Sequence, residues 1–285
     1  MNKFKIQNKK LWLSLPKMGW EVVFFLLSVT AFAEQEFEPI PDRSPIARTV
    51  LFGIGRTNQL DSYLSPMEYT GLQVSFLTKR ERMTHLANRH ISFQSTMQGA
   101  FTTTDNPAET ADFLGGRLAY DAGWHYHFYP LKKLDLKAGA LVGADLGFLY
   151  NSRNGNNPAQ GHFSADISLS AGAGYSFNIR RLQMQAAYQA DMPMIGIMFC
   201  PEFGESYYEI SQQGVGHDIL FAHPGNALSF RQLLTLDFCL RRITLRVGYL
   251  CDIRQRNARS LKYHDISHSF MFGFVRHFQL LRRTP

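Results

Sequence analysis

The sequence has 285 residues, of which 45% are hydrophobic and 13% aromatic, and its formal net charge is +7. This composition excludes a polytopic helical membrane protein, which needs several apolar spans of about 20 residues each. Residues 1–33 hold five lysines and one glutamate, so the remainder carries only +3, which is too little to indicate a nucleic-acid partner.

Residues 1–33 have the layout of a secretory signal peptide. A lysine-rich start leads into the apolar stretch VVFFLLSVTAFA, which ends on Ala31-Phe32-Ala33, a small-x-small cleavage site. The apolar stretch is shorter than the roughly 20 residues of a membrane anchor, and no cysteine follows the cleavage site as in a lipoprotein. Residues 34–48 are polar and contain prolines, which predicts a loose periplasmic tail.

A short motif follows the first predicted strand, 49–57, and runs into the second, 68–79. It consists of Leu60, Asp61, Tyr63, Leu64, Ser65 and Pro66, followed by Tyr69 and Gly71. Proline disfavours a helical conformation in the residue before it, so Ser65-Pro66 predicts a turn. The Asp61 carboxylate is suited to accept hydrogen bonds from that turn. A structural role is the favoured interpretation, and a share in a surface binding site is the alternative.

In this stretch the chain resembles a family of exported β-barrels of unknown function from Bacteroidota, in which a strand leads into Leu-Asp-x-Tyr-Leu-Ser-Pro and then Tyr-x-Gly. The positions that carry the resemblance include Asp61, Tyr63, Ser65, Pro66, Tyr69 and Gly71. The resemblance implies location and fold, and it implies no activity.

From residue 112 onward, apolar and polar residues alternate with a period of two. The longest stretches are 112–130, 133–150 and 162–179, each with one apolar face and one face of glycine, serine and charged residues. They exceed the 9–11 residues that a tilted strand needs to cross a bilayer, and aromatic residues gather toward their ends. This pattern predicts an all-β, transmembrane, antiparallel up-and-down β-barrel over residues 49–285, with the apolar face outward.

About ten strands are expected, although eight or twelve remain possible. The predicted ranges are 49–57, 68–79, 89–101, 112–130, 133–150, 162–179, 182–198, 228–240, 243–253 and 265–281. Tight basic turns at Lys132-Lys133, Arg180-Arg181 and Arg241-Arg242 alternate with long connections at 58–67, 102–111, 151–161, 199–227 and 253–264. In bacterial barrels short turns face the periplasm, which predicts that both termini are periplasmic.

The hairpin at Arg241-Arg242 makes a specific register prediction. A two-residue turn sets Asp237 opposite Arg246 and Arg231 opposite Asp252. It also points the Cβ atoms of Cys239 and Cys251 to opposite faces, so these two cysteines should not form a disulfide. In the last strand Phe270, Phe272, Phe274 and Phe278 share one face, similar to the C-terminal strand that the barrel-assembly machinery recognises.

The predicted lumen carries charges of both signs. Its main candidates are Asp145, Asp166, Arg231, Asp237, Arg246 and Asp252. Ion-paired side chains filling a small barrel are the favoured interpretation. The alternative is a carboxylate pair, Asp145 and Asp166, with His162 above it for acid–base or cation-binding work. His125 and His127 are a weak metal signal, and a structural role is the favoured interpretation of this pair. We therefore expect no catalytic residue, no metal and no cofactor.

The sequence thus predicts an outer-membrane β-barrel with a structural or surface-interaction role, through loops such as 199–227, or a narrow channel. The alternative is a hydrolase acting on lipid or peptide at the outer rim. The expected partners are outer-membrane lipid, lipopolysaccharide and the barrel-assembly machinery, with no nucleic acid and no specific ligand identified.

Overall fold

The computed structural model describes residues 46–155, 157–205, 208–209, 212, 214–240 and 243–278. The predicted signal peptide, most of the predicted tail and the Arg241-Arg242 turn lie outside this part of the chain. Helical structure within it is limited to short segments such as Leu86–Arg89 and Val215–Asp218. None of the helices described there is long and apolar enough to span a membrane.

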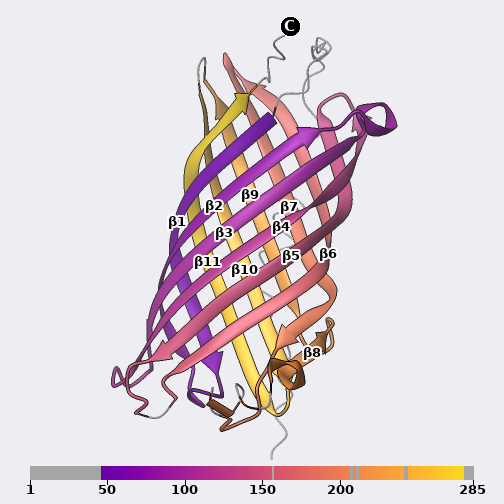
Figure 1. The fold of residues 1–285 in the computed structure, drawn as a ribbon. Helices are drawn as coiled ribbons and strands as arrows, with labels where there is room; N and C mark the ends of the chain where they lie inside the picture. The colour runs from indigo at the N-terminus through magenta and orange to yellow at the C-terminus, as the bar shows by residue number, and fades with distance from the viewer. Residues whose placement is uncertain are drawn as a thin grey trace, which may run out of the picture. The chain divides into compact units, whose positions relative to one another are not determined.

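Ten long strands form a closed antiparallel barrel (Figure 1). They are β1 (Ile46–Asp61), β2 (Tyr69–Met83), β3 (Ile91–Asp105), β4 (Asp112–Leu131), β5 (Leu134–Asn151), β6 (Ala159–Ile179), β7 (Leu182–Phe199), β9 (Ser229–Cys239), β10 (Thr244–Ala258) and β11 (Leu261–Phe278). Pairing of β1 with β11 closes the barrel. A short extra strand, β8 (Ile219–Ala222), pairs with the end of β7. The predicted ten-stranded up-and-down barrel is confirmed.

The two faces of the wall differ in polarity as the alternation predicts. Large apolar side chains are exposed on the outside, among them Phe52, Leu72, Leu118, Trp124, Val142, Ile167, Leu169 and Phe272. The buried inner positions are mostly polar, among them Gln59, Gln73, Gln94, Gln98, His125, Asp145, Ser170 and Asp252. An apolar exterior around a polar interior is the arrangement of a transmembrane barrel.

The two ends of the barrel carry different connections. β1 begins and β11 ends at the upper end in Figure 1, together with the connections 84–90, 132–133 and 180–181; we call this the terminal end. The opposite end, the loop end, carries 62–68, 106–111 and 152–158, and the longest connection, 200–228, which contains β8.

The prediction of a long loop at 253–264 is wrong. β10 and β11 stay paired up to Ala258 and Leu261, and the chain turns at Arg259 and Ser260. Both turn residues have left-handed φ angles, 50° and 65°, which a tight hairpin requires. Past Ile253 the outer face of these strands becomes polar. Because the sequence then lacks the apolar alternation of a strand, the segment was predicted to be a loop, although the strands continue.

The register predicted for β9 and β10 is confirmed. Asp237 pairs with Arg246 and Arg231 with Asp252. Cys200, Cys239 and Cys251 are all free thiols, as expected for the last two.

The first strand begins earlier than predicted. Because β1 begins at Ile46, residues 46–48, which were assigned to the tail, belong to the barrel wall.

Candidate functional site

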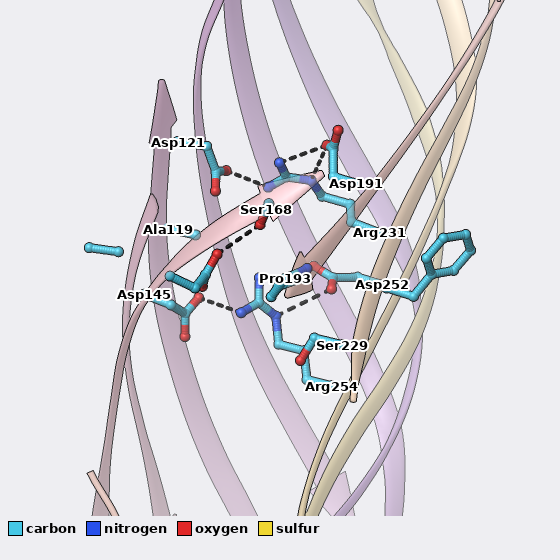
Figure 2. Close-up of a pocket in the computed structure, with 13 residues that line it drawn as sticks. Ala119, Asp121, Asp145, Ser168, Asp191, Pro193, Ser229, Arg231, Asp252 and Arg254 are labelled. Atoms are coloured by element: carbon cyan, nitrogen blue, oxygen red, sulfur yellow. Dashed lines mark hydrogen bonds and ion pairs between the residues drawn. The ribbon is translucent and has the colours of Figure 1, made fainter. Parts of the chain in front are cut away.

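An arginine at the middle of the lumen joins two aspartates from different strands. Figure 2 shows Arg231 of β9 between Asp121 of β4 and Asp191 of β7. Its Nη1 donates to Asp121 Oδ2 at 2.7 Å, and its Nη2 donates to Asp191 Oδ2 at 2.9 Å. Although Asp252 is the cross-strand neighbour of Arg231, it is not the ion-pair partner. The predicted register is therefore right, and the pairing expected from it at Arg231 is wrong.

Asp252 instead belongs to a closed ring of four alternating charges, which we call the ion-pair ring. Arg117 lies 3.0 Å from Asp145 and 2.6 Å from Asp252. Arg254 lies 2.9 Å from Asp145 and 3.2 Å from Asp252 (Figure 2 shows Arg254 between the two carboxylates). β4 and β10 have four strands between them in either direction around the barrel. The ion-pair ring therefore ties opposite walls together across the lumen.

A separate ion pair lies between the neighbouring strands β9 and β10. Arg246 contacts both oxygens of Asp237, with Nε to Oδ1 at 2.5 Å and Nη2 to Oδ2 at 2.6 Å. Arg246 Nη1 also donates to Thr49 Oγ1 of β1 at 2.9 Å. This bidentate geometry is the strongest form of an arginine–carboxylate pair.

Asp145 and Asp166 line one cavity of about 30 Å³, but each carboxylate is held by other partners and His162 does not line that cavity, so the three do not form one acid–base cluster. Asp145 is held by two arginines of the ion-pair ring. Asp166 accepts a hydrogen bond from Ser168 Oγ at 2.7 Å. His162 Nε2 lies 3.2 Å from Asp61 Oδ2, and its ring packs against Tyr263 at 4.3 Å between centroids. The pairing partner of His162 is thus a motif residue rather than a lumen carboxylate.

The two histidines on β4 contact different neighbours. His125 Nε2 lies 2.8 Å from Ser170 Oγ, whereas His127 Nδ1 lies 2.8 Å from Asp135 Oδ1 and its Nε2 lies 2.8 Å from Ser92 Oγ. In the part of the chain that the structure describes, no group of three or more histidine, cysteine, aspartate or glutamate side chains is placed to hold a metal ion.

The motif residues form a hydrogen-bonded turn at the loop end of the barrel. Asp61 Oδ1 accepts a hydrogen bond from the backbone N–H of Tyr63 at 3.0 Å, and the Asp61 carbonyl accepts from Ser65 at 2.8 Å. Tyr69 donates to Ser65 Oγ at 3.3 Å and stacks on Phe113 at 3.7 Å between ring centroids. Pro66 is exposed at the tip of the turn.

Gly71 lies where the backbones of β2 and β3 are close together. A Cβ atom there would collide with the backbone of Thr103 and Thr104. Tyr63 reaches in the other direction and donates to the carbonyl of Glu205 at 2.6 Å, which connects the motif turn to the 200–228 segment. These contacts give the motif residues structural roles.

A buried apolar cluster, which we call the plug, lies inside the barrel at the loop end. Its buried members are Leu64, Tyr69, Ala111, Phe113 and Leu149, with Tyr63 and Tyr263 packed against them. The cavity beside His162 measures about 20 Å³, and the one beside Arg231 and Arg254 about 30 Å³. Each holds one or two water molecules at most. A larger cavity of about 290 Å³, lined by Lys79, Glu81, Lys137 and Arg246 among others, lies toward the terminal end.

Sequence reasoning missed several lumen residues. Lys79 and Glu81 of β2 lie in the lumen beside Lys137, whose Nζ lies 2.7 Å from Glu81. Arg254 was assigned to a loop, because the residues after Ile253 are all polar up to Asn257, although β10 continues to Ala258.

Comparisons with known proteins give barrels of similar architecture. None of the curated proteins matches the sequence. The outer membrane protease OmpT from Escherichia coli is 7% identical, with a TM-score of 0.49 over 86% of this chain and 99% of that one. The transport unit of the autotransporter AIDA-I from Escherichia coli is 10% identical, with a TM-score of 0.39 over 90% and 97%. An outer membrane channel from Pseudomonas putida F1 is 9% identical, with a TM-score of 0.36 over 87% and 100%.

These low identities and TM-scores carry no argument about activity. A family model, in contrast, covers residues 21–285, which is almost the whole chain and all of the barrel. The chain belongs to this family, which is described as a protein of unknown function (DUF3316).

Proposed function

We propose that this protein is an outer-membrane β-barrel that does not conduct solutes and whose role is carried by the surface of its loop end. The observation that carries this proposal is the ion-pair ring of Arg117, Asp145, Arg254 and Asp252, which joins β4 and β5 to β10 across the lumen. Buried ion pairs with several partners resist separation, because each charge would be left unpaired in a medium of low polarity. The ring therefore favours a filled barrel over a narrow channel.

The plug supports the same conclusion independently. Tyr69 and Phe113 are almost fully buried, at 1% and 0% exposure, directly beneath the motif turn. A solute crossing the barrel would have to pass this apolar contact and then the ion-pair ring. The 290 Å³ cavity lies on the far side of both, so the ion-pair ring and the plug separate it from the loop end.

The loop end offers exposed apolar side chains for contacts with a partner. Phe203 and Tyr208 are each 73% exposed, and Phe221 is 60% exposed, all in the 200–228 segment. Aromatic side chains supply much of the binding energy at protein interfaces. We assign this segment the interaction role, with both termini periplasmic and the loop end outside, since long loops are extracellular in bacterial barrels. Gram-negative origin, and origin in Bacteroidota, remain predictions.

The hydrolase alternative has one observation on its side, the contact of 3.2 Å between His162 and Asp61. Their side chains are only 8% and 4% exposed, beneath Tyr263 and beside a cavity of about 20 Å³. No substrate larger than water fits beside them. A structural pair is therefore the better supported interpretation.

Conductance of the purified barrel in planar lipid bilayers tests the proposal. The natural protein should show no stepwise conductance, whereas Arg117→Ser and Arg254→Ser combined with Phe113→Ser should give discrete steps, because both the ion-pair ring and the plug are then disrupted. Arg56→Gln, at an exposed site on the barrel wall, is the matched control and should be as silent as the natural protein. Steady conductance steps in the natural protein would contradict the proposal.

A further inference from the structure

Three arginines stand in a row on the outer wall at the terminal end. Arg48 of β1 pairs with Arg276 of β11 on one side and with Arg80 of β2 on the other. All three are exposed, as is Arg82, which lies two residues beyond Arg80 on the same face. We call Arg276, Arg48 and Arg80, together with Arg82 beside them, the arginine row.

The arginine row has no counter-charge on the described part of the barrel. None of its members forms an ion pair or hydrogen bond with a described residue; the one contact is that of Arg276 with the Phe274 ring at 5.3 Å. The strand neighbours of Arg80 and Arg82 on β3 are Ser95 and Phe93, which bear no negative charge. Like charges directly opposite on neighbouring strands destabilise a sheet. An anion that bridges these guanidinium groups would remove this repulsion.

A row of three phenylalanines lies four residues further along the same strands. Phe52 of β1 pairs with Phe272 of β11 and with Phe76 of β2, and the rings of Phe52 and Phe76 lie 5.4 Å apart. Phe52 and Phe272 are 47% and 52% exposed on the apolar outer face. Four residues of a strand span about 13 Å. The wall thus passes from aromatic to strongly basic over the distance that separates acyl chains from lipid headgroups.

We propose that the arginine row is a binding site for the phosphate groups of phospholipid in the membrane leaflet at the terminal end, with the acyl chains against the phenylalanine row. Arginine suits this role because its planar fork binds phosphate oxygens through two hydrogen bonds. Charge complementarity and the spacing of the two rows select a lipid phosphate over a free anion, since only a lipid contacts both. The site depends on the transmembrane fold and not on the surface role proposed above.

The competing occupant is the acidic segment that precedes β1 in the sequence. It contains Glu34, Glu36, Glu38 and Asp42. This segment could neutralise the arginines without any lipid, but it would not account for the phenylalanine row.

The test measures phospholipid retained by the full-length barrel, by native mass spectrometry in detergent with added phosphatidylglycerol. We expect discrete lipid adducts on the natural protein. Each arginine replaced by glutamine should weaken the affinity about fivefold, and the triple variant R48Q/R80Q/R276Q about a hundredfold. R56Q is the matched control, because Arg56 is also exposed but lies toward the loop end of β1, and it should retain the adducts.

A folding control and two further variants, one with the acidic segment neutralised and one with F52S, complete the test. Heat-modifiable gel migration verifies folding, and R48Q alone replaces the triple variant if that variant does not fold. Equal lipid retention by R48Q, R56Q and the natural protein would overturn the proposal. So would a natural protein that binds no lipid until Glu34, Glu36, Glu38 and Asp42 are neutralised together, since the acidic segment would then be the occupant. Loss of lipid on phenylalanine-row substitution F52S supports the proposal.

Discussion

Asp237 and Arg246 meet in a bidentate ion pair across β9 and β10, with both carboxylate oxygens contacted at 2.5 and 2.6 Å. The two residues are nine positions apart in the sequence, on either side of the turn between β9 and β10. The hairpin register alone brings them together, so the pair reports directly on how β9 and β10 align.

Removing one partner of this pair should cost more stability than removing both. Asp237→Ala leaves the Arg246 guanidinium buried without its carboxylate, which costs about 3–5 kcal/mol. The double variant Asp237→Ala/Arg246→Ala leaves no unpaired charge and should be more stable than Asp237→Ala. The measurement is the denaturant midpoint of unfolding in detergent micelles. If the double variant loses the plain sum of the two single effects, the residues are not in contact.

Gly71 should not tolerate a side chain. A Cβ atom at this position collides with the backbone of Thr103 and Thr104, so Gly71→Ala should separate β2 from β3 and destabilise the barrel by about 1–3 kcal/mol. Gly99→Ala is the matched control, because the nearest atom to its Cβ is the Arg117 carbonyl oxygen at 3.8 Å, an ordinary contact. We expect it to change stability by less than about 0.5 kcal/mol. Equal effects would refute the close approach.

Cys200, at the loop end, should react slowly with alkylating reagents. Burial raises the pKa of its thiol, and the guanidinium of Arg259 only partly opposes this effect. The thiolate is the reactive form, so a raised pKa lowers the rate at pH 8, and the rate should climb as the pH rises toward the pKa. In a Cys239→Ser/Cys251→Ser background, iodoacetamide should modify Cys200 several-fold more slowly than a cysteine placed at the exposed Ser152 in a chain with Cys200→Ser. Equal rates at pH 8 would show that Cys200 is not shielded.

The proposed orientation can be tested on intact cells. Epitope tags inserted in 152–158 or 200–228 should bind antibody without permeabilisation, because these connections lie at the loop end. Tags at 132–133 or 180–181, at the terminal end, should become accessible only after the outer membrane is opened. Surface labelling of a tag at 180–181 on sealed cells would reverse the topology.

Mass spectrometry of the non-reduced protein tests the alignment of β9 with β10. Cys239 pairs with Thr244 and Cys251 with Gln232, so the two cysteines occupy different positions along β9 and β10. No peptide linking Cys239 to Cys251 should appear, even after mild oxidation. Such a peptide would mean that the two strands are shifted against each other.

The sequence by itself determined an up-and-down barrel of about ten strands, the polarity of both faces and the alignment of β9 with β10. These features depend on local rules: alternation with a period of two fixes which residues face inward, and a short turn fixes which residues meet across it. Where the local rule weakens, prediction fails. β10 and β11 continue to Arg259 and Ser260, but their outer residues become polar beyond the apolar band, and the continuation was taken for a loop.

Only the tertiary structure decided which charges meet across the lumen. Arg231 contacts Asp121 and Asp191 instead of its neighbour Asp252, because Asp252 is already held by Arg117 and Arg254. Which side chains of β4 reach β10 depends on the tilt of the strands and on the stagger with which the barrel closes. These are properties of all ten strands together, so no segment of the sequence contains them. The sequence therefore placed charges in the lumen, and the closure of the barrel chose their partners.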